Sequence, residues 1–201
     1  MNVSKLKNLQ VFDKKGKFTN CSLGTLQDSN RLIAVNKKYL AMIWENNKKL
    51  IVMDSSKPMK VDEKNPYFNY QCQDNVLDLE FSPFNDNILT SSINRSVVLW
   101  NIEENEAKKS ILKEKGTYKN HWNKALFLNY NPLLSNMICS SSFIGDIHVW
   151  DPNTLQSHIE IPLKKNLTNV CWNPNGSLIG ASTKDKFMNI IDVRSKSICY
   201  Q

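Results

Sequence analysis

The chain has 201 residues, of which 41% are hydrophobic and 22% are charged, a composition typical of a globular protein. Its formal net charge is +7, but only three of its 26 basic residues are arginine, the residue that readers of bases and phosphates prefer, so we expect no nucleic-acid partner. It has no apolar run of roughly 18 residues and no signal peptide, so a membrane protein is not indicated. Its five cysteines include no Cys-x-x-Cys pair, so a disulfide framework is not indicated either.

The chain repeats one pattern four times. An alternating apolar run ends in an aromatic residue, a polar step closes on proline, a second run passes through Ser and Thr, and a polar turn precedes a third run. In the three clear copies, 17 or 18 residues separate the proline from a Trp or Ile in the third run: Pro83 to Trp100, Pro132 to Trp150, and Pro174 to Ile191. A worn copy precedes them at residues 32–56, with Asn36 and Met53 in these two positions.

Short runs of β-branched and aromatic residues, cut by Asn, Gly, Pro and Asp, predict strands and tight turns. Three or four strands in a unit of roughly 40–50 residues are typical of a β-propeller blade, so we predict an all-β propeller. In chain order we expect a ring-closing strand in 1–20, a degenerate blade 1 in 21–56, a connecting loop in 57–75, blade 2 in 76–104, a connecting loop in 105–121, blade 3 in 122–154 and blade 4 in 166–201.

The repeat length and the Trp150-Asp151 pair resemble the WD-repeat family. That resemblance implies a buried network in each blade, which links a histidine, a Ser or Thr, a turn aspartate and the tryptophan. The network is eroded here. Blade 3 keeps His121, Ser140 or Ser142, and Trp150, but Ile144 occupies the aspartate position. Blade 2 keeps Trp100, but Asn94 replaces the aspartate and Cys72 the histidine. Blade 4 keeps Asp185, but Ile191 replaces the tryptophan.

The segment "GDIHVWDP", residues 145–152, raises the question of whether His148 is a ligand or a base. Its counterparts in the other copies are Val98, Asn189 and Ile51, so the position accepts any residue that can face a neighbouring blade. We interpret His148 as a packed or hydrogen-bonded residue of the scaffold.

Three longer stretches are similar to the first half of a coronin. They are "DSNRLIAVNKKYLAMIW" at 28–44, "DNVLDLEFSPFNDNIL" at 74–89 and "NVCWNPNGSLIGASTKDKFMNIIDVRS" at 169–195, in the family's order and spacing. The resemblance implies a cytoplasmic, cytoskeletal protein without enzymatic activity, which binds filamentous actin through a seven-bladed propeller and oligomerises through a C-terminal coiled coil.

The resemblance also suggests candidate actin contacts. Two arginines of the family's N-terminal region, associated with filament contact, correspond to Ser22 and Thr25 here. If filament binding is kept, neighbouring lysines must supply the charge, and the candidates are Lys14, Lys15, Lys17, Lys37 and Lys38.

The family pattern calls for seven blades and a coiled coil, whereas this sequence holds four copies and no heptad segment. We therefore expect an incomplete propeller, a truncated product or fragment, with oligomerisation only through a coiled coil that this chain lacks. We also expect its open end to expose the apolar side chains of Leu178, Ile179, Ile190 and Ile191.

No catalytic, cofactor or metal site is predicted. The sequence has no phosphate-binding glycine loop, nucleophile elbow or metalloprotease helix. Asp78 with Glu80 is interpreted as a blade rim and Glu103 with Glu104 as a solvated turn, while His121 and His158 have no ligand at metal-site spacing. The alternative function is a generic WD-repeat scaffold that assembles a multiprotein complex; a propeller hydrolase is a distant third.

Overall fold

The structure, a computed structural model, describes residues 17–25, 30–57, 59–61, 68–104 and 110–201. These residues form sixteen β-strands in four antiparallel sheets, and in each sheet neighbours in the chain are also neighbours in the sheet. No helix in this described part is long and apolar enough to cross a membrane. The prediction of an all-β chain built from four propeller blades is confirmed, whereas residues 1–16 of the expected ring-closing strand lie outside the described residues.

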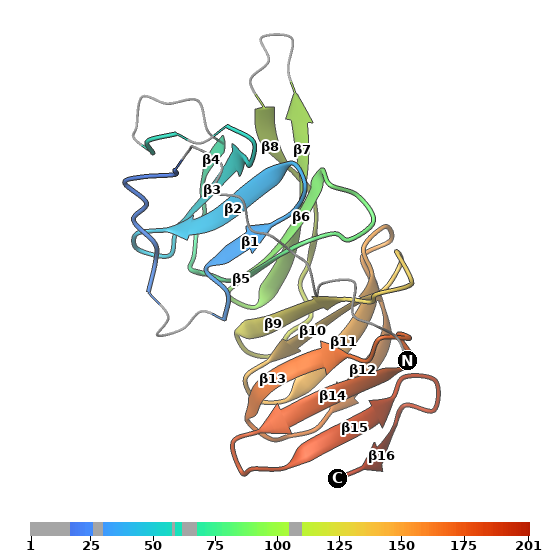
Figure 1. Cartoon of the computed structure of the whole chain (residues 1–201). Helices are drawn as coiled ribbons and strands as arrows, with labels where there is room; N and C mark the ends of the chain where they lie inside the picture. The colour runs from blue at the N-terminus through green and yellow to red at the C-terminus, as the bar shows by residue number, and fades with distance from the viewer. Residues whose placement is uncertain (1–16, 26–29, 58, 62–67, 105–109) are drawn as a thin grey trace, which may run out of the picture.

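Each sheet is a four-stranded meander, and the four sheets follow one another as a curved row (Figure 1). Blade 1 comprises β1 (Ile33–Val35), β2 (Tyr39–Trp44), β3 (Lys49–Asp54) and β4 (Phe68–Gln71). Blade 2 comprises β5 (Val76–Phe81), β6 (Ile88–Ile93), β7 (Ser96–Glu104) and β8 (Ser110–Tyr118). Blade 3 comprises β9 (Ala125–Tyr130), β10 (Ile138–Ser142), β11 (Asp146–Asp151) and β12 (Gln156–Pro162). Blade 4 comprises β13 (Leu167–Trp172), β14 (Leu178–Thr183), β15 (Met188–Asp192) and β16 (Ser197–Tyr200).

The fourth strands differ from the expected boundaries. Strands β4 and β8 lie in the segments 57–75 and 105–121, where we expected connecting loops, and β12 lies wholly beyond residue 154, the expected end of blade 3. A fourth strand pairs on one side only and buries few side chains; among the described side chains of β8, only Leu112 and Tyr118 are buried. Such a strand has little apolar alternation, which is the signal on which the boundaries were based.

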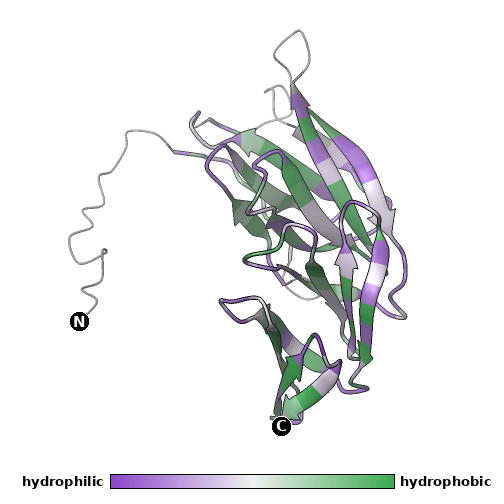
Figure 2. Cartoon of the chain, turned by 90° about the vertical axis from the view of Figure 1, so that its right-hand side faces the viewer, coloured by the Kyte–Doolittle hydropathy of each residue, from purple (hydrophilic) through white to green (hydrophobic). Residues whose placement is uncertain are grey.

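The hydrophobic core is divided into layers between successive blades. Hydrophobic and hydrophilic residues alternate along the strands (Figure 2), because successive side chains point to opposite faces of a sheet. Trp100 packs in the layer between blades 1 and 2, Trp150 in the layer between blades 2 and 3, and Ile191 in the layer between blades 3 and 4. The tryptophan position of each of these blades therefore faces the preceding blade.

This placement corrects the expected apolar surface of blade 4. Ile179 and Ile191 are fully buried against blade 3, while Leu178 and Ile190 are only partly buried. Ile190 and Ile191 are adjacent in one strand and so cannot share a face. The expectation that all four residues line one exposed face is wrong.

An ion cluster ties the innermost strands of blades 2 and 3 to the segment before blade 1. The guanidinium of Arg31 donates to both carboxylate oxygens of Asp78, at 2.8 and 2.9 Å, and to the carbonyl of Leu128 in β9, at 2.6 Å. Asp78 in turn accepts the backbone N–H of Leu128 at 2.8 Å. Burial alone would lower the pKa of Arg31, but the bonds and charges of Asp78 and Glu80 raise it.

The interpretation of Asp78 as a blade rim is therefore wrong. Its side chain is fully buried, and Glu80 beside it accepts the backbone N–H of Tyr130 at 3.2 Å. In the sequence, two carboxylates two residues apart on a strand could face either solvent or a neighbouring blade. In the structure they face inward and bond to Arg31, which lies some fifty residues earlier in the chain.

Candidate functional site

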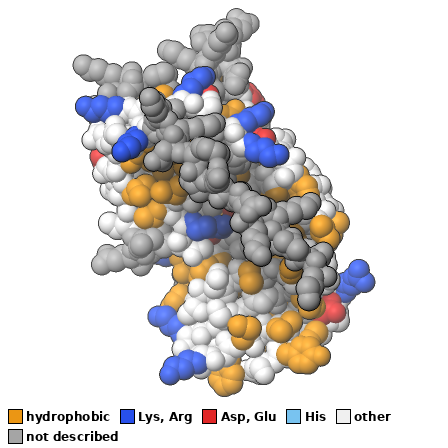
Figure 3. Space-filling model, in the orientation of Figure 1, with side chains coloured by type: hydrophobic (Ala, Val, Ile, Leu, Met, Phe, Trp, Pro, Cys, Tyr) orange, Lys and Arg blue, Asp and Glu red, His pale blue; other side chains and the backbone are white. Residues whose placement is uncertain are grey.

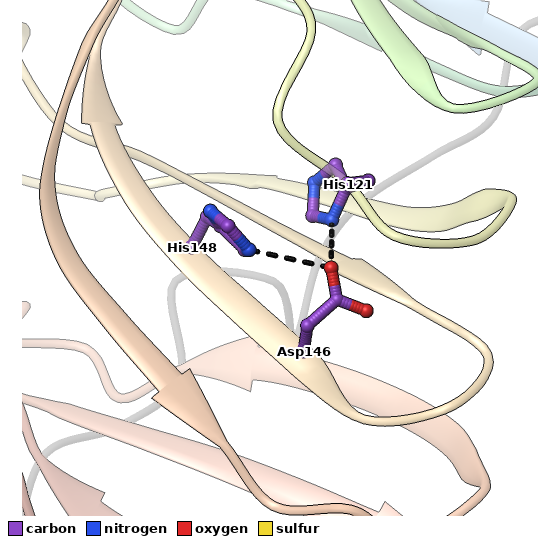
Figure 4. A group of neighbouring side chains, drawn as sticks. All are labelled: His121, Asp146 and His148. Atoms are coloured by element: carbon purple, nitrogen blue, oxygen red, sulfur yellow. Dashed lines mark hydrogen bonds and ion pairs between the residues drawn. The ribbon is translucent and has the colours of Figure 1, made fainter.

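A polar network lies inside blade 3 (Figure 4). His121 comes from the loop between β8 and β9, Ser140 from β10, and Asp146 and His148 from β11. His121 Nδ1 lies 2.7 Å from Asp146 Oδ2, and its Nε2 lies 2.7 Å from the Ser140 hydroxyl, which also accepts the Trp150 indole N–H at 3.1 Å. All of these residues are buried.

The geometry defines a consistent arrangement of protons. Ser140 accepts from the Trp150 indole and can donate its own proton to His121 Nε2, which leaves His121 Nδ1–H to donate to Asp146. Burial lowers the pKa of His121, so its ring is neutral in this arrangement. Burial would raise the pKa of Asp146, but hydrogen bonds from His121 and His148 outweigh it and hold that pKa well below its usual range.

Asp146 changes the interpretation of blade 3 as eroded. Ile144 does occupy the position of the family's aspartate, but Asp146, two residues later in β11, reaches His121 in its place. Between the two candidate serines, Ser140 joins the network, and the Ser142 hydroxyl has no partner in the described structure. The inference that this network lacks its carboxylate is therefore wrong.

His148 sits beside the network. Ser140 pairs with His148 across β10 and β11, and the same register position in the other blades holds Val98, Asn189 and Ile51, all buried. Its Nδ1 lies 2.7 Å from the Tyr118 hydroxyl, and its Nε2 lies 3.3 Å from Asp146 Oδ2.

These residue types can also bind a metal ion, and ligand atoms of His121, Asp146 and His148 all lie within 4.8 Å of one another. Both ring nitrogens of each histidine, however, already have a protein partner. The four ring nitrogens are therefore engaged in a hydrogen-bonded scaffold, while the second carboxylate oxygen of Asp146, Oδ1, is buried without a hydrogen-bond partner among the described residues.

The other two predicted networks are smaller. In blade 2, the Trp100 indole donates to Ser91 at 2.8 Å, while Cys72 lies in the apolar layer against blade 1. In blade 4, Asp185 is exposed and pairs with Lys165 at 2.8 Å and with the Thr183 hydroxyl, with no histidine or tryptophan in contact among its described partners.

The predicted actin contacts that the structure describes in blade 1 lie at its two ends. The backbone carbonyl of Ser22 accepts the N–H of Glu45, just after the end of β2, whereas Lys37 and Lys38 lie in the turn just before the start of β2. The six residues of β2 place these groups roughly 20 Å apart, at opposite ends of blade 1. Thr25 bonds to the buried side chain of Asn47 near the Ser22 end. Lys17 is exposed, and Lys14 and Lys15 lie outside the described residues.

Comparison with known proteins supplies the family. Residues 1–60 match the family model described as a domain of unknown function, DUF1899, and residues 64–101 match the WD domain, G-beta repeat. Coronin-2A of Bos taurus is 26% identical over 204 residues, which cover 94% of this chain and 38% of that protein. The coronin-like protein crn1 of Schizosaccharomyces pombe is 25% identical over 175 residues, covering 84% and 29%. The chain is similar to coronins along nearly its whole length.

The fold of this coronin-like chain agrees with that of a solved structure. The crystal structure of the WD40 domain of Toxoplasma gondii coronin matches with a TM-score of 0.80 at 21% identity, over 92% of this chain and 48% of that one. The four blades thus correspond to about half of a WD40 propeller, and the predictions of the family and of an incomplete ring are both confirmed.

Proposed function

We propose that this coronin-family chain is a non-catalytic, cytoplasmic part of the cytoskeleton that binds filamentous actin through its propeller surface. The observation that carries the proposal is the relationship to coronins along 94% of the chain, together with a four-blade fold that presents loops on rigid sheets. Rigid sheets suit a docking platform because little order has to be gained on binding.

A binding role fits the chemistry of the described residues better than catalysis does. The histidine network of blade 3 is buried and internally bonded, and the Asp78 carboxylate is bonded to Arg31. The thiols of Cys72 and Cys139 are buried as well, and desolvation raises the pKa of the Cys72 thiol to about 12. None of these groups is presented to a substrate as a base or a nucleophile.

The charge of the chain supports an acidic partner. A net charge of +7 attracts an acidic filament at long range and raises the rate of association. The attraction should weaken as salt is added, because screening acts mainly on exposed charges.

Co-sedimentation tests the proposal. The chain is mixed with actin filaments over a range of filament concentrations and centrifuged, and the bound fraction is measured at rising potassium chloride. We expect saturable pelleting at low salt that declines with salt, and none in tubes without filaments. Absence of pelleting at low salt would overturn filament binding and favour the scaffold alternative.

A further inference from the structure

One end of blades 3 and 4 concentrates lysine and aromatic side chains that the sequence analysis did not select. It consists of four segments: the loop 119–124 before β9, the turn 143–145 between β10 and β11, the loop 163–166 before β13, and the turn 184–187 between β14 and β15. We call it the lysine face, after its members Lys119, Lys124, Lys164, Lys165, Lys184 and Lys186.

Main-chain hydrogen bonds join these segments into one surface. Phe143 N donates to the carbonyl of Lys124, Leu163 N to that of Gly145, and Lys184 N to that of Asn166. Because each bond links two of the four segments, the lysine face is continuous across both blades. In Figure 3, Lys and Arg side chains project from the left edge of the lower half of the molecule, the edge at which the β14–β15 turn lies in Figure 1.

The charge of the lysine face is strongly one-sided. Its six lysines are accompanied by a single exposed carboxylate, Asp185, which pairs with Lys165. The turns at the opposite end of the same two blades, residues 131–137, 152–155, 173–177 and 193–196, hold only Arg194 and Lys196 as basic residues. The positive charge of blades 3 and 4 is thus gathered at one end, which favours an acidic partner there.

Aromatic side chains lie among the lysines. Lys165 Nζ lies 4.6 Å from the ring centre of Phe187, and Lys184 Nζ lies 4.9 Å from that of Phe143, distances that fit cation–π contacts. Trp122 is 64% exposed and forms one wall of a pocket of about 290 Å³ with Ile144, Gly145 and Pro162. An exposed tryptophan beside a pocket, surrounded by charge, is typical of the centre of a protein interface.

We propose that the lysine face is the surface with which this chain contacts the acidic side of an actin filament, with Trp122 as its apolar anchor. The proposal rests on the proposed function, and it moves the contact from the N-terminal lysines of blade 1 to blades 3 and 4. It also explains how binding can be kept where the family's two arginines are replaced by Ser22 and Thr25.

Two charge-reversal variants of equal size test this placement. The first is the triple variant Lys164→Glu, Lys184→Glu and Lys186→Glu on the lysine face. The second is Lys37→Glu, Lys38→Glu and Lys196→Glu, in turns at the opposite end of the blades. Both change the net charge equally, so a general loss of long-range attraction affects both alike.

Filament affinity by co-sedimentation is the readout, after circular dichroism has shown that each variant is folded. We expect the lysine-face variant to bind about tenfold more weakly and the opposite-end variant less than about threefold more weakly. We also expect Trp122→Ala to lose about fivefold, and Phe84→Ala, which removes another exposed aromatic, to bind like the unaltered chain.

The outcomes separate this inference from the proposed function. If the unaltered chain does not pellet, filament binding itself is overturned. If it pellets and the two triple variants lose equal affinity, or the opposite-end variant loses more, the lysine face is not the contact surface although filament binding stands. If Trp122→Ala binds like the unaltered chain, the anchor is wrong.

Discussion

Asp146 Oδ2 accepts a hydrogen bond from His121 Nδ1 at 2.7 Å, across a sequence separation of 25 residues. The contact joins the loop that precedes β9 to β11, two strands away in the same sheet. Through Ser140 in β10, His121 is in turn linked to the Trp150 indole. A side chain two residues from the expected aspartate position thereby performs the structural role of that aspartate.

Replacing the carboxylate tests this role. Asp146→Ala leaves His121 Nδ1–H without its acceptor inside the blade, so we expect the free energy of unfolding to fall by about 2–4 kcal/mol. Urea unfolding monitored by tryptophan fluorescence measures it. The matched control is Asp185→Ala, which removes an exposed carboxylate from the next blade and should change the urea midpoint little. Equal losses would contradict the role.

The same network predicts a dependence of stability on pH. Burial lowers the pKa of His121, so below the ordinary histidine pKa of about 6.5 the unfolded chain binds a proton that the folded chain does not. Stability should therefore fall as the pH drops below about 6.5, by up to about 1.4 kcal/mol per pH unit. Urea midpoints between neutral and mildly acidic pH measure the slope. His121→Gln should reduce it and His158→Gln, at an exposed position, should keep it.

Gly145 is required by the turn that supports the lysine face. Its φ is +92°, and a Cβ placed there would lie 2.5 Å from the backbone carbonyl oxygen of Lys165. We expect Gly145→Ala to lower the free energy of unfolding by about 2 kcal/mol. Gly180→Ala is the control, because its Cβ would meet nothing closer than 3.7 Å and the backbone is ordinary strand. A neutral Gly145→Ala would contradict this account.

Arg31 should be coupled energetically to Asp78. Arg31→Met leaves a fully buried carboxylate without its cation, and we expect a loss of about 3 kcal/mol of unfolding free energy. Adding Asp78→Asn removes the unpaired charge and should recover part of that loss. A double-mutant cycle from urea unfolding measures the coupling, and strictly additive losses would count against it.

The five cysteines should fall into two classes of reactivity. Cys72 and Cys139 are buried, and desolvation raises the pKa of both thiols, so their thiolates are scarce at neutral pH. Cys21, Cys171 and Cys199 are exposed. In the folded chain we expect a thiol reagent to modify three cysteines rapidly, and in urea all five. Rapid modification of Cys139 in the native chain, detected by peptide mapping, would show that the layer between blades 3 and 4 opens.

The sequence predicted the blades because their inner strands carry the signal. The core layers between blades draw most of their side chains from the first three strands of each blade, and this burial imposes the apolar alternation there. The outer strands β4 and β8 were missed because few of their described side chains are buried.

The polar contacts were harder to predict, because they depend on distances through space. Asp146 acts from a position shifted by two residues, and Arg31 meets Asp78 across 47 residues of chain. The lysine face, too, draws on four separate segments, and each of them holds only a few basic residues. No local pattern marks such groups.

The reach of Arg31 has a consequence for synthesis of the chain. Arg31 precedes the first blade, yet its guanidinium bonds to the carbonyl of Leu128 in the third, and Asp78 between them bonds to the backbone N–H of the same residue. A nascent chain that has left the ribosome only as far as blade 2 holds a charged pair whose main-chain partner, Leu128, has not yet emerged. We therefore expect the Arg31–Asp78 pair to gain its last two bonds, and the first two blades their final stability, only once the inner strand of the third has emerged.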